Sequence, residues 1–234
     1  MSLDPRKARI TSTFGEWPQW RKDAGLDWHN ADDMHGQNAN DFGEPIIATH
    51  DGTVASVGAF ASSSSGHGPT IDHGGFGIQH WHQEQPINIS LGLKVGDRVR
   101  AGATIGFIGN KGFSTGPHSH CMISVKRNAD GFFNFSRYDG WLVAPQAYLN
   151  GDYLTDAALD SMFKGDVAVE GNSLVVCQRY VTRAQLDLYA NRIISVNIAR
   201  PDGKFTTYIP GAPSFVNAAF PTVLPQGQVV LIKR

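Results

Sequence analysis

A pair of histidines, His118 and His120, could bind a metal or exchange protons, and it stands directly before the apolar segment 121–125. Side chains alternate along a strand, so both imidazoles are expected on one face, with Ser119 and Cys121 on the other. Neutral imidazole binds transition metals and exchanges protons near neutral pH. The pair therefore predicts a metal or proton-transfer site, with two histidines on a solvated strand face as the alternative.

Two further elements can complete such a site. His29 and Asp33 stand four residues apart in what is expected to be a polar loop, and they offer a nitrogen and a carboxylate oxygen to a metal. His80-Trp81-His82 supplies another pair of imidazoles, expected on one strand face with Trp81 on the opposite face. A catalytic zinc site needs three protein ligands and a neighbouring base, drawn here from separate strands. Each element alone would more simply be a solvated loop or a pair of surface histidines.

All nine histidines lie between His29 and His120, in a part of the chain that is predicted to be β-structure. From residue 46 to residue 125, short apolar runs alternate with glycine, and helical periodicity is scarce. Strands are expected at 46–48, 53–57, 69–72, 104–108 and 121–125, with a hairpin turn at Asp51-Gly52. This pattern is typical of an antiparallel β-domain.

The pattern changes after Trp141, and a domain boundary is expected near residue 150. The segment 144–149 would form the last turn of a first domain, residues 1–150, and residues 151–234 would form a small α+β module. The predicted elements of this module are helices over 155–164 and 182–191, the second capped by Thr182, and strands at 173–177, 193–198, 205–209 and 228–232. No motif assigns a role to this module.

Composition argues against several classes of protein. Twenty basic and twenty-one acidic residues give a formal net charge of −1, so no overall field favours nucleic acid. No apolar run reaches the length of a membrane span, and no signal peptide is visible in the first residues. The two cysteines, Cys121 and Cys177, are too few for a disulfide scaffold. A bridge between them stays open, although a buried Cys121 thiol is preferred.

In their order along the chain, these motifs resemble peptidase family M23, the lysostaphin and LytM group, over roughly residues 10–150. The matching segments are His29-x-x-x-Asp33, 43–48, 51–54, 71–74, His80-x-His82, 95–110 and Ser114-Thr115-Gly116-Pro117-His118-x-His120. The last segment, with the Val-Gly-x-x-Val stretch that begins at Val95, is the most specific part. The resemblance implies a mainly β fold, with an antiparallel β-sheet catalytic domain of the lysostaphin/LytM type.

The resemblance also implies roles for five residues. His29, Asp33 and His120 would bind one zinc ion, and His82 and His118 would be the catalytic pair. Zinc lowers the pKa of its bound water, and a neutral imidazole can take the proton as that water attacks a peptide carbonyl. The chain contains no His-Glu-x-x-His motif, so the glutamate base of other zinc peptidases is not expected.

The chain departs from the family pattern after the first motif. The segment 34–42 differs from the usual short link and supplies a rival pair of ligands, His35 and Asp41. His29 and Asp33 are preferred because their spacing matches the family motif. Three tryptophans ahead of this motif either line one wall of a substrate groove or pack at its rim: Trp17, Trp20 and Trp28.

The resemblance implies a zinc-dependent endopeptidase that hydrolyses cross-links or stem peptides of bacterial peptidoglycan. Peptidoglycan peptide would be its partner, and its place would be extracellular, periplasmic, cell-wall associated or virion-associated. Two alternatives stay open: a non-catalytic relative that binds cell wall or activates another hydrolase, and the same activity in a phage virion-associated lysin. The full set of five site residues favours an active enzyme.

Overall fold

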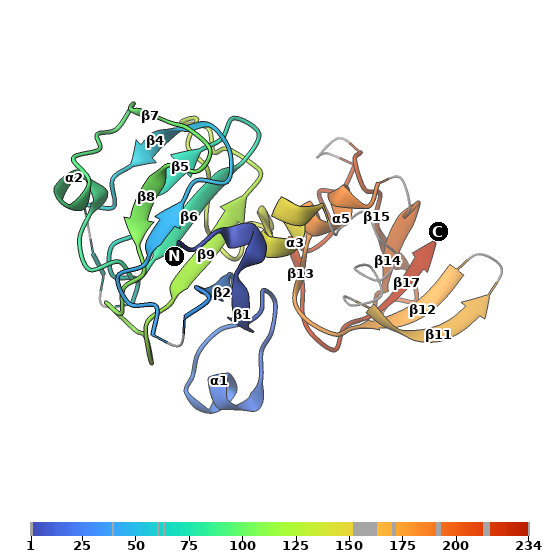
Figure 1. Cartoon of the computed structure of the whole chain (residues 1–234). Helices are drawn as coiled ribbons and strands as arrows, with labels where there is room; N and C mark the ends of the chain where they lie inside the picture. Colours follow the sequence, from blue (N-terminus) through green and yellow to red (C-terminus); the bar gives the residue numbers. More distant parts are fainter. Residues whose placement is uncertain are drawn as a thin grey trace. The chain divides into compact units, whose positions relative to one another are not determined.

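The structure is a computed structural model, and it describes residues 2–38, 40–59, 61–62, 64–151, 163–169, 172–190, 193–212 and 216–233. The chain divides into two compact units (Figure 1). The first comprises Met1–Phe14, Asn30–Phe135 and Val143–Asn150, and the second comprises Gly15–His29, Ser136–Leu142 and Gly151–Arg234. That residues 1–150 and 151–234 are separate domains stays a prediction.

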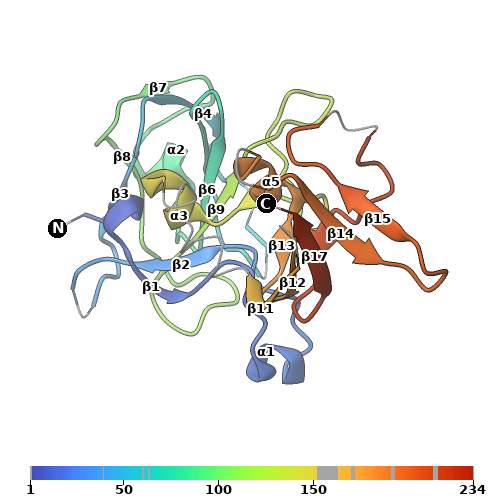
Figure 2. The same ribbon diagram turned by 90° about the vertical axis from the view of Figure 1, so that its right-hand side faces the viewer.

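An antiparallel sheet forms the centre of the first unit, with the strand order β1-β2-β9-β6-β5-β4-β7, so that β9 lies between β2 and β6 (Figure 1, Figure 2). The strands are β1 Arg9–Ser12, β2 Asp32–His35, β4 Gly52–Ser56, β5 Thr70–Asp72, β6 Gly77–Trp81, β7 Arg98–Val99 and β9 Ser119–Ser124. A separate antiparallel pair is formed by β3 Pro45–Ile47 and β8 Thr104–Phe107. Short helices are η1 Pro5–Lys7, α2 Ile87–Ser90 and α3 Pro145–Asn150. The mainly β, antiparallel fold predicted from the sequence is confirmed.

The five strands predicted for this unit are confirmed as β3, β4, β5, β8 and β9, each within two residues of the expected bounds. The predicted hairpin turn at Asp51-Gly52 is wrong. Gly52 begins β4, which pairs with β5 and β7, whereas β3 pairs with β8. The apolar pattern therefore identified both strands, but their partners depend on segments far along the chain.

The second unit contains a sheet with the strand order β11-β12-β17-β14-β15. Its strands are β11 Phe163–Val169, β12 Asn172–Cys177, β14 Ser195–Ala199, β15 Phe205–Tyr208 and β17 Val229–Lys233. The remaining elements are α1 Gln19–Asp23, β13 Val181–Thr182, α5 Arg183–Leu188 and β16 Val223–Leu224. The short strand β10 Leu142–Val143 pairs with β9 of the other sheet. A hydrophobic core of this unit includes Val175, Cys177, Leu186, Val196, Phe220 and Ile232.

The capped second helix of this unit is confirmed, and the first is not. The Thr182 hydroxyl accepts a hydrogen bond from the Gln185 N–H, and the Gln185 side chain accepts one from the Thr182 N–H, which is a capping box. Residues 155–162 of the helix predicted over 155–164 lie outside the described residues. Its last two residues, Phe163 and Lys164, belong to strand β11 instead. Where the structure describes a helix, that helix is too short or too polar to cross a membrane.

Asp32 joins β2 to two other segments of the first unit. Its Oδ1 accepts a hydrogen bond from the Phe14 N–H at 2.8 Å, and its Oδ2 accepts one from the Gln146 N–H at 2.9 Å, in the first turn of α3. The Asp32 residue is buried. A buried carboxylate is tolerated when N–H groups satisfy it, and such charge-assisted bonds are strong. Asp32 therefore stabilises the position of β2.

We expect Asp32→Ala to lower the free energy of unfolding by about 2–4 kcal/mol, because two backbone N–H groups lose a charged acceptor. Urea denaturation of chelator-treated protein measures this loss without a contribution from bound metal. Asp202→Ala is the control, because the Asp202 side chain is 44% exposed beside Arg200, and its loss should cost less than about 0.5 kcal/mol. Equal stability of the two variants would contradict this role of Asp32.

Candidate functional site

The pairing of β9 with its two neighbours gathers side chains from three strands. Asp33 of β2 lies opposite His120 of β9, and Trp81 of β6 lies opposite the same histidine from the other side. Directly opposed residues in antiparallel strands share a face of the sheet. Asp33, His120 and Trp81 therefore share one face, and the ring centroids of Trp81 and His120 are 5.0 Å apart in a stacked arrangement.

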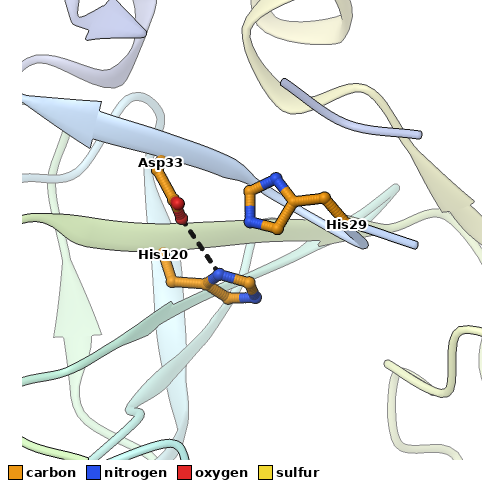
Figure 3. A group of neighbouring side chains, drawn as sticks. All are labelled: His29, Asp33 and His120. Carbon is orange, nitrogen blue, oxygen red and sulfur yellow. Dashed lines mark hydrogen bonds and ion pairs between the residues drawn. The ribbon is translucent and has the colours of Figure 1, made fainter. Parts of the chain in front are cut away.

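His29, Asp33 and His120 form a group that could hold a metal ion (Figure 3). One nitrogen or oxygen atom from each residue lies within 4.8 Å of the others, and Figure 3 shows the three side chains directed toward one another. The His120 Nδ1 lies 3.0 Å from the Asp33 Oδ1. In the part of the chain that the structure describes, no other set of His, Cys, Asp or Glu residues forms such a group. Two imidazole nitrogens and one carboxylate oxygen suit zinc and leave a fourth position for water.

The three residues of this group are largely shielded from solvent. His29 is 1% exposed and His120 is 8% exposed, while the Asp33 side chain is 18% exposed. The His29 backbone is held on both sides, because its N–H donates to the Glu16 carbonyl and its carbonyl accepts from the Gly15 N–H. Partial exclusion of water strengthens the attraction between a cation and these donors.

His118 adjoins the ligand group directly before β9. Its Nδ1 donates to the Gly116 carbonyl at 2.8 Å, and its Nε2 lies 3.4 Å from the Asp33 Oδ1. Burial disfavours the charged imidazole, but the hydrogen bond and the charge of Asp33 outweigh burial and raise the pKa of His118. The structure therefore brings His118 and His120 to one face, as the strand alternation predicted.

His82 reaches the same group through a turn of the backbone. Strand β6 ends at Trp81, and His82 has a φ of 71°, in the left-handed region. The centroid of its ring lies 4.6 Å from that of His118 and 5.7 Å from that of His120. The His82 Nδ1 donates to the Lys111 carbonyl at 2.7 Å. A neutral ring in this tautomer keeps its lone pair on Nε2.

The prediction that His80 and His82 share a strand face, with Trp81 opposite, is wrong. Alternation holds as far as Trp81, and the left-handed residue His82 then turns its ring back to the Trp81 side. His80 lies on the other face, where its Nδ1 is 2.9 Å from the Ser119 Oγ. Burial, and to a smaller extent the nearby His73, lowers the pKa of His80 to about 3. His80 is therefore a neutral residue of the core.

The rival ligands, His35 and Asp41, lie at the two ends of one loop and are in contact with one another. The Asp41 Oδ2 accepts a hydrogen bond from the Gly36 N–H at 2.8 Å and lies 3.2 Å from the His35 Nδ1. The His35 Nε2 lies 3.1 Å from the Thr11 Oγ1. Burial lowers the pKa of His35 although the Asp41 charge opposes that effect. Both ring nitrogens have protein partners, which favours a structural role for this pair.

Other residues singled out in the sequence lie in packed surroundings. Cys121 and Cys177 are both free and buried, so the preferred buried thiol at Cys121 is confirmed and the two cysteines form no bridge. Trp28 is 3% exposed and stacks on Tyr180 with 5.2 Å between ring centroids, which is the packing role. Trp20 is 55% exposed.

Two backbone carbonyls orient the rings of His82 and His118, and no motif in the sequence points to them. These carbonyls belong to Lys111 and Gly116. Every residue has a carbonyl, so neither residue type signals this role. The one available signal is that Gly116 stands two residues before His118, which favours a local contact.

Comparison with known proteins places most of the site residues in a recognised sequence family pattern. Residues 33–130 match the model of peptidase family M23. The match confirms, over this segment, the resemblance to the family that the motifs carry. The matched segment includes Asp33, His82, His118 and His120, and His29 lies just ahead of it.

Two curated proteins and one solved structure illustrate the similarity. The chain is 35% identical over 88 residues to an uncharacterized metalloprotease from Haemophilus influenzae, which covers 37% of this chain and 17% of that protein. It is 31% identical over 97 residues to the glycyl-glycine endopeptidase ALE-1 from Staphylococcus capitis, which covers 42% of this chain and 25% of that protein. The chain thus spans a quarter or less of the length of these relatives. The solved catalytic domain of lysostaphin from Staphylococcus simulans is 22% identical with a TM-score of 0.45, over 62% of this chain and 94% of that domain.

Asp33→Ala should weaken zinc binding by about 100-fold or more, because even residues behind metal ligands contribute about 10- to 100-fold to affinity. Asp41→Ala is the matched control and should leave zinc affinity within about threefold, because Asp41 bonds to His35 and Gly36 outside the ligand group. Competition with a chromogenic chelator measures both affinities. The reverse result would make His35 and Asp41 the true pair.

Proposed function

We propose that the chain is a zinc-dependent endopeptidase that hydrolyses stem peptides or cross-links of bacterial peptidoglycan. The observation that carries the proposal is the group of His29, Asp33 and His120 with two further histidines, His82 and His118, beside it. Metal-assisted hydrolysis needs three protein ligands, an open coordination position and a group that exchanges protons. These five residues can supply all three requirements.

A peptide of the cell wall is the substrate that the relatives favour. The Staphylococcus capitis protein is named as a glycyl-glycine endopeptidase, and its similarity to this chain extends over 97 residues. A glycine-rich bridge is a thin, extended peptide, and such a peptide would fit beside a metal on the face of a sheet. This substrate would place the protein in the cell wall, in the periplasm or on a virion.

The ligand group would hold the metal through the side chains of His29, Asp33 and His120. When bound, zinc lowers the pKa of a coordinated water toward neutrality and polarises a carbonyl oxygen. The strand pairing fixes Asp33 and His120 relative to one another, because they are directly opposed on β2 and β9. The stacked ring of Trp81 limits rotation of the His120 imidazole.

His82 and His118 would transfer the proton and stabilise the developing negative charge. Each ring donates its Nδ1–H to a backbone carbonyl, that of Lys111 or of Gly116, so each presents Nε2 as the exchanging nitrogen. A neutral imidazole accepts the proton of the attacking water, and a protonated imidazole donates a hydrogen bond to the oxyanion and a proton to the leaving amine. The two ring centroids are 4.6 Å apart, so both can act on one peptide bond.

Purified protein should contain about one zinc ion per chain and should clear suspensions of bacterial walls. A chelator should stop the clearing and added zinc should restore it, because the proposed chemistry depends on the metal. Metal analysis and loss of turbidity measure the two properties. Metal-free protein that still clears walls would refute the zinc mechanism. Zinc-loaded protein that binds walls without clearing them would identify the non-catalytic alternative.

Variants of His118 and His120 should separate metal binding from proton transfer. The strand rises about 3.3 Å per residue, so the attachment points of His118 and His120 are roughly 6–7 Å apart. His118→Ala should keep its zinc and lose about 10² to 10⁴ in turnover, whereas His120→Ala should lose the metal. Zinc content and the rate of wall hydrolysis are measured for each variant. A zinc-free His118→Ala protein would show that the two histidines have exchanged roles or that both bind the metal.

A further inference from the structure

His82 is in a backbone conformation that its side chain disfavours. Among the residues that the structure describes, it is the one residue other than glycine with a positive φ, at 71°. The left-handed conformation brings the Cβ of an L-residue close to the following carbonyl oxygen, which costs free energy. Such strain persists only where the surroundings hold it, and it is concentrated at functional sites. The contacts that hold His82 therefore bear on its proposed role.

The backbone of His82 is bonded on both sides to other loops. Its N–H donates to the Ser65 carbonyl at 2.8 Å, and its carbonyl accepts from the Lys111 N–H at 3.1 Å. The Lys111 carbonyl in turn accepts the Nδ1–H of the His82 ring. These bonds fix the ring relative to the loop that contains Lys111, but none of them reaches strand β6 or β8.

The next residue, Gln83, supplies that connection. It is 2% exposed, and its backbone N–H and carbonyl both pair with His67, at 3.2 Å and 3.1 Å. Its Oε1 accepts a hydrogen bond from the Phe107 N–H at 3.2 Å, and its Nε2 lies 3.3 Å from the His80 carbonyl, to which it donates. The Gln83 side chain thus ties the turn both to β8 and to the last residues of β6.

Two glycines of the neighbouring segment leave room for this turn. A Cβ at Gly106 would collide with the side-chain amide of Gln83, and a Cβ at Gly109 would collide with the His82 carbonyl oxygen. The turn is therefore packed against backbone on the β8 side. A side chain at 83 without the two amide bonds could shift in this space and let His82 relax.

We propose that Gln83 is a positioning residue: its buried amide holds the left-handed turn that directs the His82 ring to the face of His118 and His120. Without the turn, strand alternation would place residue 82 on the same face as His80. This inference rests on the proposed function, in which His82 exchanges the proton. It assigns a role to a residue that touches neither the ligand group nor the substrate.

Gln83→Met keeps the length and volume of the side chain but removes both amide bonds. In initial-rate assays on purified bacterial walls, it should lower kcat by about 10- to 100-fold, because a catalytic group displaced by about 1 Å can cost 10²-fold. KM and zinc content per chain should stay within about twofold of the wild-type values. A kcat within about twofold of wild type would overturn the proposal.

Gln185→Met is the matched control for loss of a buried glutamine. Gln185 is 4% exposed and accepts a backbone hydrogen bond in the capping box of α5. This variant should lower the unfolding temperature and leave kcat unchanged. A loss of kcat in Gln185→Met as large as that in Gln83→Met would overturn the proposal, because both effects would then reflect general destabilisation.

A second pair of variants tests the strained turn without any measurement of activity. His82→Gly and His82→Ala both remove the ring, but only glycine adopts a positive φ without strain. The glycine variant should therefore unfold about 2–4 °C above the alanine variant. Equal unfolding temperatures would overturn the inference that the turn is held against strain. This comparison remains decisive if the wild-type protein proves not to hydrolyse walls, so the two failures are distinguishable.

Discussion

The register of β9 against β2 and β6 is the constraint on which the site depends. Because side chains alternate along a strand, a slip of one residue between β2 and β9 would move Asp33 away from the face of His120. Asp32 opposes such a slip, since backbone N–H groups of Phe14 and Gln146 bind its carboxylate. Two adjacent aspartates thus have different surroundings: Asp32 stabilises the strand, and Asp33 belongs to the ligand group.

Burial and hydrogen bonding give chemically identical imidazoles different pKa values and different orientations. His80 is enclosed in the core, and burial lowers its pKa to about 3, so it stays neutral. His118 lies beside Asp33, whose charge raises its pKa in spite of burial. The orientation of the His82 ring is set by the Lys111 carbonyl, which accepts its Nδ1–H. One residue type therefore takes different roles according to the groups around each ring: packing at His80 and, in the proposed function, metal ligation at His120 and proton transfer at His82 and His118.

The strands with strong apolar patterns could be predicted, and those with polar sequences could not. β4 and β9 contain β-branched and apolar runs, which are local signals of a strand. β2 has the sequence Asp-Asp-Met-His and was expected to be a polar loop. It is a strand because β1 and β9 pair with it on either side and because Met34 packs in the core.

The sequence by itself carries the resemblance to peptidase family M23. That resemblance implies His29, Asp33 and His120 as ligands, and the fold brings these three residues together. Only the tertiary structure decided the face on which His82 lies. Its left-handed backbone depends on bonds from Ser65 and from other loops, and simple alternation predicted the opposite relation to its neighbours. Residue type and spacing are local properties, whereas strand register and the handedness of a turn are set by contacts between segments that are distant in the chain.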